Sequence, residues 1–310
     1  MVSSSKILVV GPEEVKEHVL PHLQKKFSTV VFAPPEKITL FSGEDNKALF
    51  GKVDLSTFSY ALILADSSKK EFYYTLTRVL NQQGVKTSIS VDSLFYFWQR
   101  PVLFRILSRE GIPIRKIYAI SQDVAAEVIL KELKLPVIIV PPSEKAIYVS
   151  KEETLKNVLS LFSPGNMITA QKPIKVDSSI IAFATPTEVV AYEKIEENRR
   201  ATVPDDRAKE IAQNVRKAVN SDFITVFMLK KGKKYYVSNV RLLPPFKTFK
   251  KVAGRDLGSI IAAELVQLVP EFSFLDAIES ATRTFVEGFV NALRWLGDEI
   301  SNNRSPKKRL

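Results

Sequence analysis

Lysines and arginines gather late in this 310-residue sequence and are its most evident candidates for binding a ligand. They lie around and beyond a predicted β-hairpin that turns at Gly232, and no Asp or Glu occurs between Phe223 and Gly254. The chain as a whole has a formal charge of +11. A field of one sign favours anionic partners, so we predict a site for a polyphosphate, a nucleic acid or an acidic protein. The cations of this region are Arg199, Arg200, Lys230, Lys231, Lys233, Lys234, Arg241, Lys247, Lys250, Lys251 and Arg255.

Two aromatic residues, Phe246 and Phe249, lie among the lysines that follow the hairpin. Rings interleaved with cations can stack on single-stranded bases, but the same rings could instead anchor the loop to the core. An ordinary solvated surface of a thermophile-like protein would also carry such charges. No helix-turn-helix, RNA-binding or zinc-finger signature occurs, so a nucleic-acid-associated protein is a second alternative. The residues predicted to bind the anion are Arg241, Lys247, Lys250 and Lys251.

Residue types that are missing exclude several kinds of site. Without cysteine the chain has no disulfide, no thiolate nucleophile and no cysteine zinc site. The two histidines, His18 and His22, have helical spacing but no evident third ligand, which favours a solvated helix face over a metal site. The apolar run before Gly11 is too short for a signal peptide, and no stretch approaches the ~18 apolar residues of a membrane span. These features predict a cytoplasmic protein that does not enter membranes.

Strand and helix patterns alternate in the first 92 residues, which predicts a parallel sheet with crossover helices. The strands are KILVV, STVVFA and YALILA, and the helices are PEEVKEHVLPHLQKKF and KKEFYYTLTRVLNQQG. A lone Gly11 after the first strand is too little to indicate a dinucleotide-binding motif.

The middle of the chain continues with a helix that ends at Gly111 and an apolar strand over residues 137–140. Ser150 and Glu153 have the spacing of a capping box at the start of another helix. From about Met167 the pattern is rich in strands. An apolar stripe between residues 275 and 300 predicts a long C-terminal helix, which either packs on its own domain or forms a homo-oligomer contact.

The order of these elements, together with several short motifs, resembles the ATP-grasp superfamily. A small α/β unit is followed by a helix ending in REGIPI, by the helix and strand LKLPVIIVPP, and by a β-rich stretch that closes on YYVSNVRLLPPF. This arrangement is similar to that of glutathione-synthetase-like ligases. The stretches SVDSLFYFWQRPVLFRILSREGIPI and YYVSNVRLLPPFKTFKKVAGRDLGSII more closely resemble the kinase domain of diphosphoinositol polyphosphate kinases. The resemblance covers roughly residues 5–265.

This resemblance implies an α/β and α+β fold of the ATP-grasp type: an N-terminal parallel α/β subdomain, two α+β subdomains and a C-terminal helix. The implied parts are an α/β domain over 1–92 and an ATP-grasp-like domain over 93–265 with its flap subdomain at about 115–166. A helical extension over 266–301 and a disordered basic tail over 302–310 complete the prediction.

The resemblance also implies where ATP would bind. Arg100 lies at a first cationic phosphate contact and Lys194 at another cationic position, whereas Val140 stands where the family has a second cation. Lys145 is a candidate replacement for it. The flap is only PPSEK and lacks the glycines that let a backbone approach phosphates closely. The predicted cofactor-binding residues are Arg100, Lys145, Lys194 and Asn239.

The implied metal site is the largest departure from the family. Phe227 and Asn239 stand where carboxylates would hold magnesium, and Arg241 stands where an asparagine would. Magnesium prefers carboxylate and phosphate oxygens, and a cation in place of a ligand repels it by ~4 kcal/mol per pair of unit charges at ~4 Å and an effective dielectric of about 20. Phosphoryl transfer depends on such a metal. We therefore predict no metal ligand and no catalytic residue, with ATP as a candidate ligand and magnesium not expected.

The function predicted from the sequence is that of a pseudoenzyme: an ATP-grasp-like protein that binds an anionic ligand or a macromolecular partner. The alternative is an atypical ATP-dependent ligase or inositol-phosphate-like kinase that uses substitute metal ligands. The carboxylates in neighbouring strands that could serve it are Glu188, Glu193, Glu196 and Glu197.

Overall fold

A parallel sheet forms the N-terminal part of the protein, as the alternating pattern predicted. The computed structural model describes residues 3–41, 43, 46–140, 146–163, 165 and 167–269. In the parallel sheet the strand order is β2-β1-β6-β7, and every neighbouring pair is parallel. The strands are β1 (Ser3–Val10), β2 (Phe27–Ala33), β6 (Tyr60–Ile63) and β7 (Lys86–Thr87). Residues 7–10 of β1 are fully buried, as expected for a strand that is covered on both faces.

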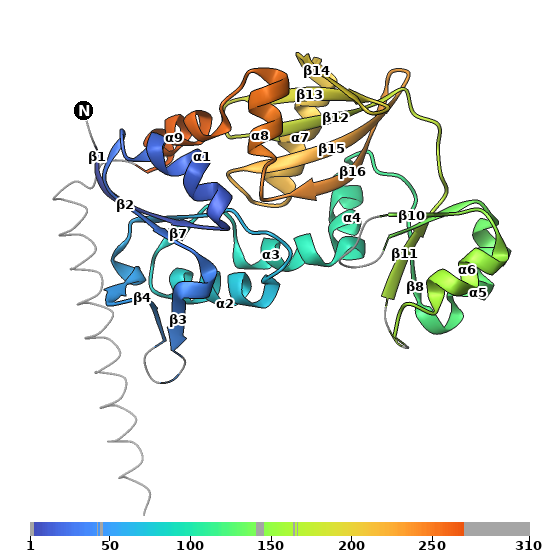
Figure 1. Ribbon diagram of the computed structural model, residues 1–310, viewed down its shortest axis with the longest axis horizontal. Coiled ribbons are helices and arrows are strands. Elements are labelled where there is room, and N and C mark those ends of the chain that lie inside the picture. The colour runs from blue at the N-terminus through green and yellow to red at the C-terminus, as the bar shows by residue number, and fades with distance from the viewer. Residues whose placement is uncertain are drawn as a thin grey trace, which may run out of the picture. The chain divides into compact units, whose positions relative to one another are not determined.

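Three helices accompany this sheet (Figure 1), and a small antiparallel sheet that the sequence patterns did not predict adjoins them. The helices are α1 (Glu13–Leu23), α2 (Lys70–Gln82) and α3 (Val91–Trp98). The extra strands are β3 (Ile38–Phe41), β4 (Lys47–Phe50) and β5 (Val53–Asp54). At two to four residues each, with few side chains buried, these strands are too short to produce a recognisable alternation.

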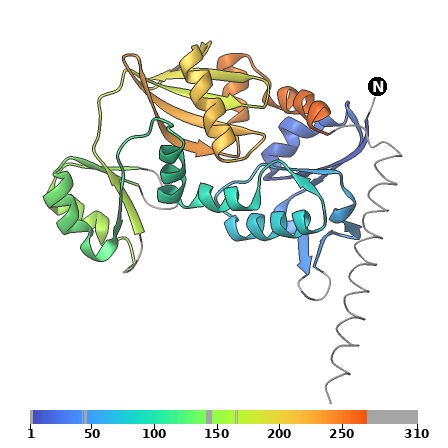
Figure 2. The same cartoon turned by 180° about the vertical axis from the view of Figure 1, so that it is seen from behind.

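A second, antiparallel sheet with the order β10-β9-β11-β8 is built from the middle of the chain and has its own hydrophobic core. Figures 1 and 2 show it at one end of the structure, with α5 and α6 on one of its faces. Its strands are β8 (Tyr118–Ser121), β9 (Val137–Val140), β10 (Ile147–Val149) and β11 (Met167–Gln171). The accompanying helical segments are η3 (Gln122–Val124), α5 (Ala125–Val128), η4 (Ile129–Leu133) and α6 (Glu152–Leu159).

The predicted cap of α6 is wrong. The residue that precedes the helix is Lys151, and no side chain accepts a hydrogen bond from the first turn. Ser150 lies one residue earlier, because the chain is still leaving strand β10 there and the helix begins only at Glu152. The two glutamates of the first turn remain favourable to the helix dipole.

The largest sheet has five antiparallel strands in the order β14-β13-β12-β15-β16. The strands are β12 (Ser178–Ala184), β13 (Val189–Ile195), β14 (Asn198–Thr202), β15 (Ile224–Lys231) and β16 (Lys234–Arg241). Helix α7 (Asp206–Ala218) covers one face, as Figure 2 shows, and its buried residues share a core with β12 and β15. Asp205 caps α7 by accepting from the amide of Ala208 at 2.8 Å. The hairpin of β15 and β16 turns at Gly232 as predicted.

The other face of this sheet packs on the elements that follow it. They are α8 (Phe246–Thr248), η5 (Phe249–Ala253) and α9 (Leu257–Leu268). The remaining helix, α4 (Arg100–Arg109), lies between α3 and β8 in the chain. Phe246 and Phe249 are buried in a core that also contains residues of β1 and α1, so these rings anchor the loop and are not free to stack on bases. Gly258 of α9 lies so close to α1 that an added Cβ would meet the carbonyl oxygen of His18 at 1.8 Å.

Some predictions concern residues outside those that the structure describes. These are Lys145, the helix expected up to residue 301 beyond residue 269, and the basic tail over 302–310. The predicted domain boundaries remain predictions. Within the described part of the chain no helix is both long and apolar enough to cross a membrane.

Candidate ligand pocket

A cavity of about 790 Å³ lies where residues from all three larger sheets meet. Ala65 and Asp66 line it at the carboxyl end of β6, Val140 from β9 and Asn239 from β16. The carboxyl ends of parallel strands are a usual place for a ligand in α/β folds. A smaller cavity of about 260 Å³ shares Lys70, Trp98 and Arg100 with this one. We refer to the larger cavity as the pocket.

The pocket combines apolar walls with a group of cations. Its apolar side chains include Phe97, Trp98, Ile138, Val140, Ile174 and Leu229. Its cations are Lys70, Arg100, Arg115 and Arg241, and the one carboxylate among the described lining residues is Asp66. That carboxylate already accepts hydrogen bonds from the backbone and side chain of Ser68, at 2.6 and 2.5 Å. A ligand with a flat apolar part and an anionic part matches such a lining.

Arg100 is held at the start of α4 by one hydrogen bond and one ring contact. Its Nη2 donates to the backbone oxygen of Ser238 at 2.8 Å, and its guanidinium lies 4.7 Å from the ring centroid of Phe104. Its Nε is buried without a partner among the described residues. Burial lowers the pKa of Arg100 to about 10, so the side chain remains cationic at neutral pH.

Arg115 is the most deeply buried cation of the pocket. It lies between α4 and β8, next to Ile114, which forms an isolated parallel bridge with Val237 of β16. Only 9% of Arg115 is exposed, and burial lowers its pKa. It makes no hydrogen bond or ion pair with any residue that the structure describes. A buried cation without a counter-charge is energetically unfavourable on its own.

A β-bulge at Ser238 aligns the three residues at the predicted metal position. Near the turn Lys231 pairs with Lys234, whereas Phe227 pairs with Asn239, so β16 has gained one residue between these pairs. The gain places Asn239 directly opposite Phe227 and Arg241 opposite Thr225, on the face that borders the pocket. Two polar groups of Ser238 are hydrogen-bonded: its Oγ donates to the backbone oxygen of Phe227 at 3.0 Å, and its own backbone oxygen accepts from Arg100.

Arg241 stacks on Phe227, with its guanidinium 5.0 Å from the ring centroid. This distance is within the range of a cation–π interaction. Tyr192 lies on the same face: burial raises its pKa, and the nearby charges of Arg199 and Arg241 partly offset that rise. Arg241 is exposed and lies at the edge of the pocket, with its guanidinium next to the ring of Phe227.

These residues do not fit a magnesium ion. The described part of the chain contains no group of three or more His, Cys, Asp or Glu side chains that could hold a metal. Phe227 offers no oxygen and Asn239 a single neutral one, whereas magnesium sites use one or two carboxylates together with substrate phosphates. Arg241 adds a positive charge at the same place.

The structure brings only some of the predicted site residues together. Arg100, Asn239 and Arg241 all line the pocket. The pocket lining does not include Lys194, Lys247, Lys250 or Lys251. Lys194 lies 3.4 Å from Glu197 and Lys250 lies 3.6 Å from Asp256.

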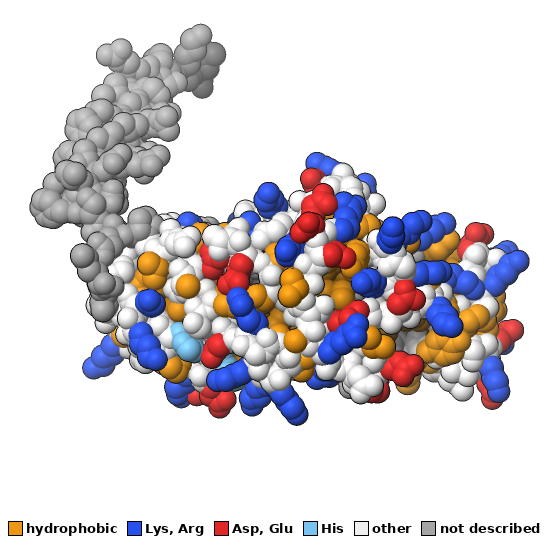
Figure 3. Space-filling view, turned by 90° about the horizontal axis from the view of Figure 1, so that it is seen from above, with side chains coloured by type: hydrophobic (Ala, Val, Ile, Leu, Met, Phe, Trp, Pro, Cys, Tyr) orange, Lys and Arg blue, Asp and Glu red, His pale blue; other side chains and the backbone are white. Residues whose placement is uncertain are grey.

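On the face shown in Figure 3, the exposed lysines and arginines do not form a single basic patch. Lys247 and Lys251 are exposed, like many lysines and arginines of the chain. In Figure 3 cationic side chains are spread over the face seen from above, with acidic ones among them. In the pocket, four cations of the described residues lie with one carboxylate.

Two cations of the pocket, Lys70 and Arg115, were missed by the sequence analysis. Lys70 follows strand β6 at the first residue of α2, and the carboxyl end of a parallel strand is a signal that could have identified it. No local pattern marks Arg115, because its burial depends on the bridge between Ile114 and β16.

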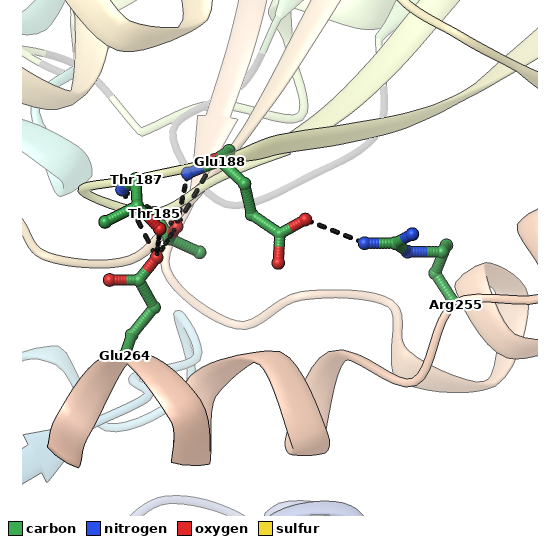
Figure 4. A network of polar contacts seen from close by, with 5 residues as sticks. All are labelled: Thr185, Thr187, Glu188, Arg255 and Glu264. Atoms are coloured by element: carbon green, nitrogen blue, oxygen red, sulfur yellow. Dashed lines mark hydrogen bonds and ion pairs between the residues drawn. The ribbon is translucent and has the colours of Figure 1, made fainter. Parts of the chain in front are cut away.

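Two of the four carboxylates considered as substitute metal ligands, Glu188 and Glu193, interact with residues outside the pocket. Glu188 forms an ion pair with Arg255 at 2.7 Å (Figure 4). Glu193 is 6% exposed and accepts from Ser178 at 2.6 Å and from Arg200 at 2.6 and 2.8 Å. Burial alone would raise the pKa of Glu193, but these hydrogen bonds bring it below its usual value. Neither glutamate lines the pocket.

Comparison with known proteins identifies the fold. No protein-family model matches the chain, and no curated protein matches its sequence. Among solved structures, the ATP-grasp ligase PsnB in complex with a phosphomimetic variant of its minimal precursor, Mg and ADP is similar, with 12% identity and a TM-score of 0.67. That match covers 86% of this chain and 100% of the other.

Two further structures agree. A RimK-domain ATP-grasp protein from Sphaerobacter thermophilus has 15% identity and a TM-score of 0.67 over 84% of this chain and 98% of its own. The D-alanine–D-alanine ligase from Bacillus anthracis, complexed with ATP, has 18% identity and a TM-score of 0.65 over 87% of this chain and 100% of its own. The chain therefore has the ATP-grasp fold, as the resemblance implied.

Proposed function

We propose that this ATP-grasp protein binds an anionic ligand in the pocket and does not carry out magnesium-dependent phosphoryl transfer. The observation that carries this proposal is Arg115, a cation that is 9% exposed and has no ion pair within the described residues. Arg100, with its buried and unpartnered Nε, lines the same cavity. An anion that enters would supply the counter-charge that the chain itself does not.

A nucleotide is the ligand that we propose as the first probe. PsnB and the D-alanine–D-alanine ligase are similar structures that were solved with ADP and with ATP. The apolar walls of the pocket, among them Ile138, Ile174 and Leu229, suit a base, and its cations suit the phosphates. Catalysis is not part of the proposal, because Phe227 and Asn239 leave the developing charge without a metal to neutralise it.

An ATP-dependent enzyme is the second candidate, and Asp66 favours it. This carboxylate lines the pocket and could join phosphate oxygens in holding a magnesium ion. To bind magnesium, Asp66 would have to give up the hydrogen bonds that it accepts from Ser68. An enzyme of this kind would bind Mg·ATP productively and consume it.

The test is a calorimetric titration of the full chain with ATP, with and without magnesium, at ~50 and ~200 mM salt. We expect binding by the wild type without magnesium. Arg115→Met should weaken it by at least about tenfold, which corresponds to ~1.4 kcal/mol. Arg109→Met, which changes an exposed arginine of α4 outside the pocket, is the matched control and should bind like the wild type.

Four results would contradict the proposal. No heat of binding at either salt concentration, or equal affinity of Arg115→Met and the wild type, would show that the pocket is not the anion site. Release of ADP or phosphate during the titration with magnesium would favour the enzyme. A weakening by salt that is the same in all variants would instead assign binding to the exposed lysines.

A further inference from the structure

We propose that Arg241, stacked on Phe227, replaces the divalent cation of the pocket, so that the ligand is a polyphosphate in its metal-free form and magnesium weakens its binding. This inference rests on the proposed function and deepens it. It names the charge state of the ligand and the residue that selects it.

The first argument is the position of the guanidinium. The bulge at Ser238 places Asn239 opposite Phe227 and Arg241 opposite Thr225. Without the extra residue, Arg241 would point to the opposite face of the sheet. The ring of Phe227 then holds the guanidinium at 5.0 Å, and Arg241 also lies among the residues that line the pocket. A permanent cation is therefore built into the strand pair that contacts the ligand.

The second argument is charge balance. The described lining has four cations (Lys70, Arg100, Arg115 and Arg241) and one carboxylate (Asp66), a net charge of +3. Within the same lining, Asp66 is committed to Ser68 by two hydrogen bonds. A polyphosphate chain matches this excess of positive charge best when no metal is bound to it. Magnesium neutralises two of its charges and brings a cation toward Arg241.

The third argument is the chemistry of the two cations. A guanidinium has a planar set of donors that pairs with phosphate oxygens in two parallel hydrogen bonds. It remains charged at every physiological pH, unlike a metal site, whose occupancy depends on supply. Arg241 can therefore neutralise phosphate without a coordination shell, which Phe227 and Asn239 could not complete.

The experiment compares ATP and inorganic tripolyphosphate as ligands of the full chain, by calorimetry, in EDTA and in excess magnesium at matched ionic strength. We expect the wild type to bind both ligands about tenfold or more tightly in EDTA. Arg241→Ala should lose about tenfold in EDTA and should no longer distinguish the two conditions. Arg241→Lys, which keeps the charge, should retain part of the preference. Arg109→Ala, which removes an exposed cation of α4 outside the pocket, should behave like the wild type.

A double variant tests the proposal in the opposite direction. Asn239→Glu combined with Arg241→Asn supplies a carboxylate and an amide oxygen and removes the cation. Its affinity for ATP should rise, not fall, when magnesium is added. Unchanged circular dichroism and thermal unfolding would show that each variant is folded.

The outcomes separate this inference from the proposed function. If neither ligand binds in any condition, both proposals are overturned. If the wild type binds but magnesium strengthens binding or leaves it unchanged, the pocket is an anion site and the replacement of the metal by Arg241 is wrong. If Arg241→Ala keeps the preference of the wild type, another residue is responsible and the assignment to Arg241 fails.

Discussion

Two buried charged residues, Glu264 and Arg115, differ in the partners that their own chain gives them. Glu264 of α9, which is 3% exposed, receives donors from residues that follow the end of β12. Its Oε1 accepts from the hydroxyl of Thr185 at 2.5 Å, from the amide of Thr187 at 3.2 Å and from the hydroxyl of Thr187. Figure 4 shows this network, with Glu188 and Arg255 paired beside it. In the pocket, Arg115 is buried to a similar degree and has no such partners in the described chain.

The proposed function implies that Glu264 is a structural charge and that Arg115 is a ligand-binding one. Glu264 is an acceptor that several donors hold in place, although its Oε2 is buried without a partner among the described residues. Its removal should cost stability and leave ligand binding intact. Arg115 contributes no hydrogen bond to the fold, so its removal should cost binding and leave stability intact. Substitutions in the two regions can test this contrast.

The largest effect on stability is expected from Thr185→Val. The exchange keeps the shape of the fully buried side chain and removes a hydroxyl that donates to Glu264 and accepts from the amide of Glu188 at 3.0 Å. Loss of a hydrogen bond to a buried charged group should lower the free energy of unfolding by ~2–3 kcal/mol. Urea denaturation measures this change. Thr75→Val, at an exposed position of α2, is the control and should remain within ~0.5 kcal/mol of the wild type.

The effect of Thr185→Val on ATP affinity should be negligible, since the network does not line the pocket. A variant that loses affinity together with stability would show that the two regions are coupled and that the contrast is wrong.

A smaller effect of opposite sign is expected from Arg115→Met. Methionine keeps an unbranched apolar side chain and removes a charge that burial disfavours, as the lowered pKa of Arg115 indicates. We expect the free energy of unfolding of the ligand-free protein to stay the same or to rise by up to ~1 kcal/mol, as is common where stability is given up for function. A loss of more than ~1 kcal/mol would mean that Arg115 has a structural partner, and the argument for the pocket would weaken accordingly.

The smallest effect is expected from Arg255→Ala. The ion pair with Glu188 is solvent-exposed on both sides, and exposed pairs contribute ~0.2–1 kcal/mol at most. Thermal unfolding at low and high salt should show a difference from the wild type that fades as salt screens the pair. A large loss of stability that salt does not reduce would indicate that Arg255 belongs to the buried network.

The sequence allowed much of the fold to be predicted because its strands are apolar and its turns are marked. Residues 7–10 and 137–140 are continuous apolar runs, and Gly232 closes a hairpin between two alternating strands. The sequence also showed that Phe227, Asn239 and Arg241 stand at the positions of the family's metal ligands. These positions could be assigned because all three residues lie close to the Gly232 turn. The structure then showed these three side chains on one pair of strands.

The rest of the pocket depends on contacts between distant parts of the chain. Lys70 and Arg115 have neighbours in the sequence that give no sign of a site, and they line one cavity only because three sheets meet there. Conversely, Lys194 was predicted as a ligand contact from the family resemblance and Lys250 from the charge pattern, but each lies next to an acidic residue in the fold. The sequence shows the sign of each charge, whereas the structure shows which residue that charge lies next to.

The bulge at Ser238 has a consequence for how this pocket could change over evolution. Side chains alternate between the two faces of a strand, so the face that Arg241 occupies depends on whether the number of residues between the Gly232 turn and Arg241 is odd or even. A deletion of one residue from β16 would move Arg241 to the opposite face without altering any other amino acid. Arg100 of helix α4 donates a hydrogen bond to the backbone oxygen of Ser238 and so contacts the bulge directly. The contribution of Arg241 to the positive charge of the pocket therefore depends on the number of residues in β16, and deletion of a single codon could remove it.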